Sequence, residues 1–185
     1  MSQNIPSNRD DFHRIYKGYE SFLREAGEKF NFLCKDNNYH LVESGLFSPT
    51  YYRDANAKLK YSSSKIGIEI SWFFPEGLID ITFFELKEGR FPISSDKEIN
   101  IFDIYDLVEF IKKSDPLPFF VLKSPDNISV RMIKKRQELL SNNLSGILDN
   151  LVENLKENGK RIFDGDLKIF SEIQEFNKMK VFNKT

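Results

Sequence analysis

The spacing of hydrophobic residues changes twice along the chain, from a helical period to a strand period and back. Between Asp10 and Asp36 apolar residues recur every third or fourth position, as on one buried face of a helix. From Tyr39 to Lys87 apolar and polar residues tend to alternate, which is typical of half-buried strands. The helical spacing returns after Ile99. This order predicts an α+β domain in which helices pack on one face of an antiparallel sheet.

The first helix is predicted over residues 10–36, and its end is marked by Asn37 and Asn38. Gly18 and Gly27 have low helix propensity, so we expect a bend or break at one of them. Residues 1–8 are polar and are expected to be flexible. The apolar stripe of this helix consists of Phe12, Ile15, Tyr16, Tyr19, Phe22, Leu23, Ala26, Phe30 and Leu33.

Four strands are predicted after this helix, which places the sheet within a range of about three to five strands. The stretch Lys58–Ser62 is expected to be an edge strand, because lysines discourage unwanted pairing at an edge. The clearest pair flanks Pro75, Glu76 and Gly77 and forms a central hairpin. The predicted strands are Tyr39–Phe47, Lys58–Ser62, 65–74 and 78–87.

The alternation within the hairpin separates an apolar face from a mixed one. The apolar face carries Ile66, Ile68, Ile70, Trp72, Phe74, Ile79, Ile81 and Phe83. It must pack against helices, because exposure would cost roughly 25 cal/mol per Å². The mixed face combines Glu69 and Asp80 with Phe73 and Phe84. Either loops or helices cover this face, or it is a wet surface on which the two aromatics serve as anchors.

The second half of the chain is predicted to be mainly helical. Asp115–Pro118 is a rigid stop between helices, and Asn158-Gly159 ends the longest one. Asp166 is a suitable N-cap for the last helix, and residues 178–185 are expected to be flexible. No linker divides the chain, so residues 1–185 are predicted to be a single domain. The predicted elements are a helix over Ile99–Lys113, an extended piece at Phe119–Leu122, a helix over Ser129–Asn158 and a helix from Asp166.

Composition narrows the class of protein. The chain has 185 residues, of which 40% are hydrophobic and 30% charged, so it is too apolar to be disordered. It contains 18 phenylalanines, which implies a thick core, exposed apolar patches, or both. A net charge of −1 gives no overall attraction to nucleic acid. No apolar run is long enough to span a bilayer, and no signal peptide is recognised, so a cytoplasmic location and no membrane association are expected.

The sequence contains no motif for hydrolysis, phosphoryl transfer or nucleotide binding. Its only histidines are His13 and His40, and its only cysteine is Cys34. A metal site or a Cys–His nucleophile built from these residues lacks any defining spacing. No catalytic residue, metal or cofactor is therefore predicted.

Charge distribution suggests a partner. Residues 76–109 contain nine acidic and three basic side chains, a net charge of −6. Glu69 and Asp80 are predicted to be cross-strand neighbours, either as an acid–base pair or, more often, as an acidic patch facing solvent or a partner. The basic cluster from Arg131 to Arg136 is interpreted as a solvated helix face. It lacks interleaved aromatics, so nucleic-acid binding is not expected.

The order of features resembles the small immunity proteins of bacterial polymorphic-toxin systems. The matching segments are FNFLCKDNNYHLVES, KYSSSKIGIEISWFF followed by GLIDITFFEL, and FDGDLKIFSEI. The resemblance implies a non-enzymatic protein that binds one toxin tightly, with no catalytic residues. On this reading Glu69, Phe73, Asp80 and Phe84 face a basic toxin domain, while Trp72 faces inward.

A second class of function stays open from sequence. A small-molecule-binding or enzymatic α+β domain would have its site in a cleft between sheet and helices, and a pocket lined by Tyr51, Tyr52, Glu69 and Trp72 would favour it. Neither the partner nor the oligomeric state is predicted by the sequence.

Overall fold

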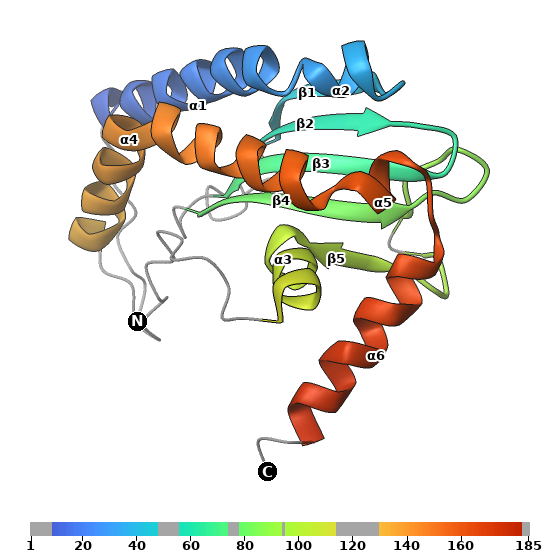
Figure 1. Ribbon diagram of the computed structural model, residues 1–185. Helices are drawn as coiled ribbons and strands as arrows, with labels where there is room; N and C mark the ends of the chain where they lie inside the picture. The colour runs from blue at the N-terminus through green and yellow to red at the C-terminus, as the bar shows by residue number, and fades with distance from the viewer. Residues whose placement is uncertain (1–8, 48–55, 74–77, 94, 114–129, 183–185) are drawn as a thin grey trace.

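The computed structural model describes residues 9–47, 56–73, 78–93, 95–113 and 130–182, and it confirms the α+β class. A five-stranded antiparallel sheet has the order β1-β2-β3-β4-β5, and helices α1 and α4 cross one of its faces (Figure 1). The elements are α1 (Arg9–Lys29), α2 (Phe32–Asp36), β1 (His40–Phe47), β2 (Asn56–Ser62), β3 (Ile66–Phe73), β4 (Leu78–Glu85), β5 (Ile101–Asp103), α3 (Ile104–Lys112), α4 (Val130–Asn158), α5 (Lys160–Phe163) and α6 (Lys168–Phe182).

The predicted N-terminal helix is divided, but not at a glycine. Its first part ends at Lys29, and α2 begins at Phe32 after a turn. Positions 30 and 32 lie about 200° apart around a continuous helix, so Phe30 and Phe32 could not both face the sheet without this turn. Both are buried in the core. Gly18 lies within α1 and against the sheet, where a Cβ would make an ordinary van der Waals contact, 3.4 Å from Cη2 of Trp72.

The prediction that Lys58–Ser62 forms an edge strand is wrong. The strand β2 lies between β1 and β3 and pairs with both along its whole length. Its lysines do not guard an edge, because Lys60 reaches Glu43 on one side and both Lys58 and Lys60 reach Glu69 on the other. The β3–β4 hairpin is confirmed, with Ile70 opposite Ile81 and Trp72 opposite Ile79.

The predicted helix over Ile99–Lys113 is also corrected. Residues 101–103 form β5, which pairs with β4, and the helix begins only at Ile104. Phe102 enters the core between Phe83 and Phe170, with ring centroids 5.0 and 4.8 Å away. Asp103 then caps α3 by accepting the backbone N–H of Asp106. Burial of Phe102 thus favours a strand where the local pattern is helical.

The C-terminal helices follow the prediction with two changes. The helix α4 ends at Asn158 as predicted, but the short helix α5, which the sequence did not indicate, follows directly after Gly159. The last helix, α6, continues to Phe182 instead of loosening at Lys178. The predicted cap is present, because Asp166 accepts the backbone N–H of Lys168 at 3.1 Å. The predicted stop at 115–118 and the extended piece at Phe119–Leu122 lie outside the described residues. Within the described part of the chain, every helix is too short or too polar to cross a membrane.

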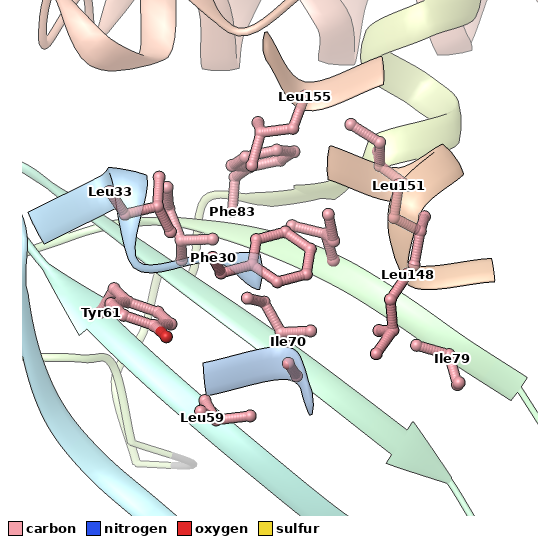
Figure 2. Packing of buried hydrophobic residues seen from close by; sticks show 14 of the residues in the cluster. Phe30, Leu33, Leu59, Tyr61, Ile70, Ile79, Phe83, Leu148, Leu151 and Leu155 are labelled. Carbon is pink, nitrogen blue, oxygen red and sulfur yellow. The ribbon is translucent and has the colours of Figure 1, made fainter. Parts of the chain in front are cut away.

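The core lies between the apolar face of the sheet and the helices. Figure 2 shows Leu148, Leu151 and Leu155 of α4 directed toward the side chains of the strands. Trp72 is 1% exposed and is packed edge-on by Tyr19 and Phe22 of α1. The predicted members of this core are buried: Ile66, Ile68, Ile70, Ile79, Ile81, Leu144, Leu148 and Leu151.

We expect Ile70→Ala to lower the free energy of unfolding by about 2–5 kcal/mol, because it removes buried methyl groups and leaves a cavity. Chemical denaturation measures this change. Leu41→Ala is the matched control, since Leu41 is 47% exposed on β1 and its truncation should change stability by less than about 0.5 kcal/mol. Equal effects of the two substitutions would show that the apolar face of β3 is not the centre of the core.

Candidate functional site

The second face of the sheet, opposite the core, carries rows of polar side chains. In one row Lys58, Ser71 and Asp80 lie opposite one another on β2, β3 and β4. The next row continues from β1 to β5. Together the rows make up what we call the polar face: Glu43, Lys58, Lys60, Glu69, Ser71, Asp80, Thr82 and Asp103. It is the only set of ionisable groups that the register gathers on the sheet within the described residues.

Half of the polar face is a network of ion pairs. The Nζ of Lys60 lies 2.7 Å from Oε2 of Glu43 and 3.8 Å from Oε2 of Glu69. The Nζ of Lys58 lies 3.9 Å from the same Glu69 oxygen and 4.1 Å above the ring of Phe47. Burial still raises the pKa of Glu69, and the charges of both lysines oppose that rise. The two ammonium groups are therefore engaged at the β1–β2–β3 side of the face.

Asp80 lies on the other side of this face and is nearly enclosed, with 9% of its surface exposed. Its pKa is raised to about 7, mainly by burial and in addition by the charges of Asp103, Asp106 and Glu69. The N–H of Ile81 donates to its Oδ1 at 2.7 Å and opposes the shift. The charged neighbours that raise the pKa of Asp80 are thus carboxylates.

The start of α3 places more oxygen atoms beside Asp80. Asp103 pairs with Thr82 in the register of β4 and β5, and burial is the main cause of its raised pKa. Burial raises the pKa of Tyr105, and the charges of Asp80 and Asp103 raise it further. Asn177 of α6 donates to Oδ1 of Asp106 at 2.9 Å and holds α3 in place.

Ser71 stands between the two halves of the polar face. It is 0% exposed, and within the described residues its Oγ has no hydrogen-bond partner. Buried hydroxyl groups are nearly always hydrogen-bonded, because an unpaired one loses its hydration without compensation. The register turns Ser71 toward the same side as Asp80 and Glu69. Within the described residues, its hydroxyl group therefore has unused capacity to donate and to accept a hydrogen bond.

A loop after β4 folds back over one end of the polar face. Lys87 and Arg90 exchange backbone hydrogen bonds around a tight turn in which Glu88 and Gly89 have positive φ. The turn directs Phe91 onto Gly67 of β3, where a Cβ would approach the ring to 2.6 Å. Phe91 also packs edge-on against Phe84, with centroids 5.3 Å apart. Phe84 is therefore partly covered by the protein itself.

The residues predicted to bind a partner share one face. Glu69, Phe73 and Phe84 are half-buried, whereas Asp80 is buried. Glu69 and Asp80 are diagonal rather than opposite neighbours, because Glu69 lies opposite Thr82. Their contact with a partner stays a prediction.

Two of the residues whose pocket would favour a small-molecule or enzymatic role, Glu69 and Trp72, do not face the same side of the sheet. Trp72 points into the core while Glu69 lies on the opposite face of β3. Tyr51 and Tyr52 lie outside the described residues.

The sequence does not identify Ser71, Asp103 and Tyr105 as site residues. Ser71 was detectable, since it has the same parity as Glu69 on β3. Asp103 followed by Asp106 is a capping-box pattern, but its position beside Asp80 depends on the unforeseen strand β5.

The histidines and the cysteine lie away from the polar face where the structure describes them. His40 is exposed on β1, Cys34 is half-buried in α2, and the side chain of His13 is outside the described part. Of the basic cluster at 131–136, the side chain of Lys135 is described, and it is exposed. Among the described residues, no group of three or more metal-ligating side chains is close enough to hold an ion.

We expect Asp80→Asn to stabilise the protein above pH 7 by about 1–4 kcal/mol. The folded-state pKa of about 7 exceeds the value of about 3.9 in an unfolded chain, so the folded state binds the proton more tightly. This term in the stability of the wild type is therefore lost as the pH rises from about 4 to 7. Urea denaturation at pH 4 and pH 8 tests this. An equal effect of the substitution at both pH values would contradict the burial of an ionisable Asp80.

Gly67→Ala should destabilise the fold by about 1–3 kcal/mol, because the new methyl group displaces Phe91 from β3. Gly146→Ala is the control, since Gly146 is exposed in α4 and a Cβ there meets nothing within 4 Å. It should stabilise the protein by about 0.5–1 kcal/mol through helix propensity. Thermal denaturation separates the two, and a neutral Gly67→Ala variant would show that the loop does not pack on the sheet.

Comparison with known proteins gives no relative from which a function could be transferred. No family model, no curated protein and no solved structure matches the chain. The resemblance to immunity proteins therefore stays a prediction, and function is argued from the polar face alone.

Proposed function

We propose that this protein is a non-enzymatic binding module, most concretely an immunity-type inhibitor that docks a basic toxin domain on its polar face. The observation that supports the proposal is Asp80, a buried carboxyl group whose charged neighbours are further carboxylates. Four carboxyl groups and two ammonium groups share the face, namely Glu43, Glu69, Asp80 and Asp103 against Lys58 and Lys60.

An uncompensated buried carboxyl group works against folding, because removing its charge from water is unfavourable. Groups with strongly perturbed pKa values gather at functional sites for this reason. A partner that supplies a cation to Asp80 would offset the desolvation at the moment of binding. Such a contact adds affinity and also rejects partners without a matching charge.

Aromatic side chains at the ends of the polar rows suit the same role. Phe73 and Phe84 are half-buried, and Phe47 extends the row that contains Phe73 on the β1 side. Aromatic anchors beside polar groups concentrate binding energy in protein interfaces. Their partial burial holds each ring in a fixed orientation before a partner arrives, which reduces the entropy lost on binding.

A small-molecule or enzymatic role is the second candidate, and the environment of Asp80 favours it too. A carboxyl group with a pKa of about 7 suits general acid–base work at neutral pH. The two candidates differ in what Asp80→Asn does. In a binding module it weakens a protein complex, whereas in an enzyme it abolishes turnover of a substrate while a protein complex, if any, persists.

We expect Phe84→Ala to weaken the complex with the partner by about 1–3 kcal/mol, roughly a tenfold to hundredfold loss of affinity. The partner is identified by pull-down from the source cell or by co-expression with the neighbouring gene product, and affinity is then measured with purified components. Leu41→Ala, on the exposed part of β1, should leave affinity unchanged. A quadruple variant at Glu69, Phe73, Asp80 and Phe84 that binds as tightly as wild type would rule out this face as the interface.

Glu69→Lys should mainly slow association, and more strongly at low salt, because it reverses a charge that attracts a basic partner. Stopped-flow association rates at two ionic strengths measure the effect. Glu157→Gln is the control, since Glu157 is exposed on α4 and pairs with Lys112 away from the polar face. A salt-independent rate in both the wild type and the Glu69→Lys variant would contradict electrostatic attraction.

A further inference from the structure

Four oxygen-bearing side chains meet where β3, β4 and β5 lie together. Ser71 lies directly opposite Asp80, and Thr82, one position further on the same face of β4, lies directly opposite Asp103. Directly opposed Cβ atoms are about 4.5–5.5 Å apart and diagonal neighbours about 7–8 Å. Asp80 and Asp103 are therefore diagonal neighbours on one face of the sheet, with Ser71 and Thr82 directly opposite them.

Two independent observations indicate that this group of oxygens is a binding site. Burial is the main cause of the raised pKa of both carboxyl groups, and the charge of Lys180 opposes the shift of Asp103 without cancelling it. Separately, the fully buried Oγ of Ser71 has no hydrogen-bond partner among the described residues. Carboxylate oxygens accept hydrogen bonds, and a hydroxyl group both donates and accepts. Each feature is explained by a cationic donor that fits between them.

The ammonium groups that the structure describes near this site interact with other residues. Lys58 lies in the same row as Ser71, but its Nζ is near Glu69 and the ring of Phe47. Lys60 is near Glu43 and Glu69, and its Nζ lies 5.2 Å above the ring of Phe91. The charge of Lys180 of α6 lowers the pKa of Asp103, but its Nζ forms an ion pair with Oε2 of Glu109.

The spacing of the acceptors selects the type of cation. An ammonium group is a compact point charge, whereas a guanidinium is planar and presents five N–H donors in a rigid fork. The carboxyl groups of Asp80 and Asp103 are diagonal neighbours, and the hydroxyl group of Ser71 lies beside Asp80. The diverging N–H donors of a planar guanidinium match this arrangement better than a single ammonium group does. Tyr105, at the start of α3, carries a further hydroxyl group, whose pKa the charges of Asp80 and Asp103 raise.

We propose that Ser71, Asp80 and Asp103, with Thr82 and Tyr105 at the margin, form a receptor for a single guanidinium group, the side chain of an arginine on the docked partner. This deepens the proposed function and rests on it, since it names the group by which the polar face recognises a basic partner. An arginine that reaches this site supplies a countercharge to the carboxyl groups and completes the hydrogen bonding of Ser71. The same site discriminates against partners that carry lysine at that position.

The proposal is tested on the free protein with methylguanidinium chloride as the probe and methylammonium chloride as the matched control. Backbone amide shifts of Ser71, Asp80 and Asp103 are followed by NMR, and the carboxyl carbon of Asp80 is titrated with pH. We expect saturable binding with Kd of about 1 mM, which is reasonable for so small a ligand. The pKa of Asp80 should fall from about 7 by about one unit in saturating probe, a tenfold preference for the ionised form.

The variants separate a binding role from a structural one. Ser71→Ala should weaken methylguanidinium binding about three- to tenfold, as for one lost hydrogen bond, without lowering the stability of the fold. Asp80→Asn should abolish the binding. Glu157→Gln, an exposed carboxylate on α4, should bind the probe no differently from wild type. The Oγ of Ser71 has no hydrogen-bond partner within the described residues, so Ser71→Ala breaks no hydrogen bond of the fold. A loss of probe binding in this variant is therefore not explained by destabilisation.

Several outcomes would overturn the inference. One is the absence of saturable shifts up to about 100 mM probe, a concentration well above the expected Kd. Others are equal binding of methylammonium, tighter binding of Mg²⁺ or Ca²⁺, or wild-type affinity in both Ser71→Ala and Asp80→Asn. If the protein partner binds normally while methylguanidinium does not, the inference fails and the proposed function survives. If the probe binds but the quadruple variant keeps its affinity for the partner, the proposed function fails instead.

Discussion

The register of β3 between β2 and β4 is the constraint on which the rest of the structure depends. Ile66, Ile68, Ile70 and Trp72 of this strand are buried against α1 and α4. A slip of one residue would move all of these side chains to the other face and bring Glu69 into the core. The burial of apolar surface therefore fixes, as a consequence, which residues of β2, β3 and β4 meet on the polar face. Core packing therefore determines where the candidate site lies on the sheet, but it does not determine which polar side chains the site contains.

Positive and negative charges are not evenly balanced across the polar face. Toward β1 the charges are paired, with Lys60 between Glu43 and Glu69, so partial burial is compensated. Toward β5 burial raises the pKa of Asp80 and Asp103, and neither carboxyl group has an ion pair like that of Lys60 with Glu43. Low local polarity strengthens paired charges and penalises unpaired ones. The uncompensated side, where a ligand would contribute most, is also the side that α3 and α6 hold in place through Asp106 and Asn177.

The two ends of the sheet are protected in different ways against pairing with other chains. At one end β5 contains only residues 101–103, and the chain turns at once into α3. At the other end β1 has exposed Leu41 and Val42, but the register shifts between Leu41 and Glu43 and disturbs the regularity of the strand. Short edge strands and bulges both reduce edge-to-edge association. The interaction surface proposed for this protein therefore lies on a face of the sheet and not along its edge.

The sequence by itself determined the features whose information is local. The β3–β4 hairpin follows from alternation around a short turn, and the faces of α4 follow from helical spacing. Only the tertiary structure decided that β2 is an interior strand, that Phe102 makes residues 101–103 a strand, and that α1 ends before Phe32. The proximity of Ser71, Asp80 and Asp103 likewise depends on pairing between β4 and a strand that has no pattern of its own. A strand of three residues is too short for its hydrophobic pattern to identify it. The strand β5 forms because burial of the Phe102 ring against Phe83 stabilises it.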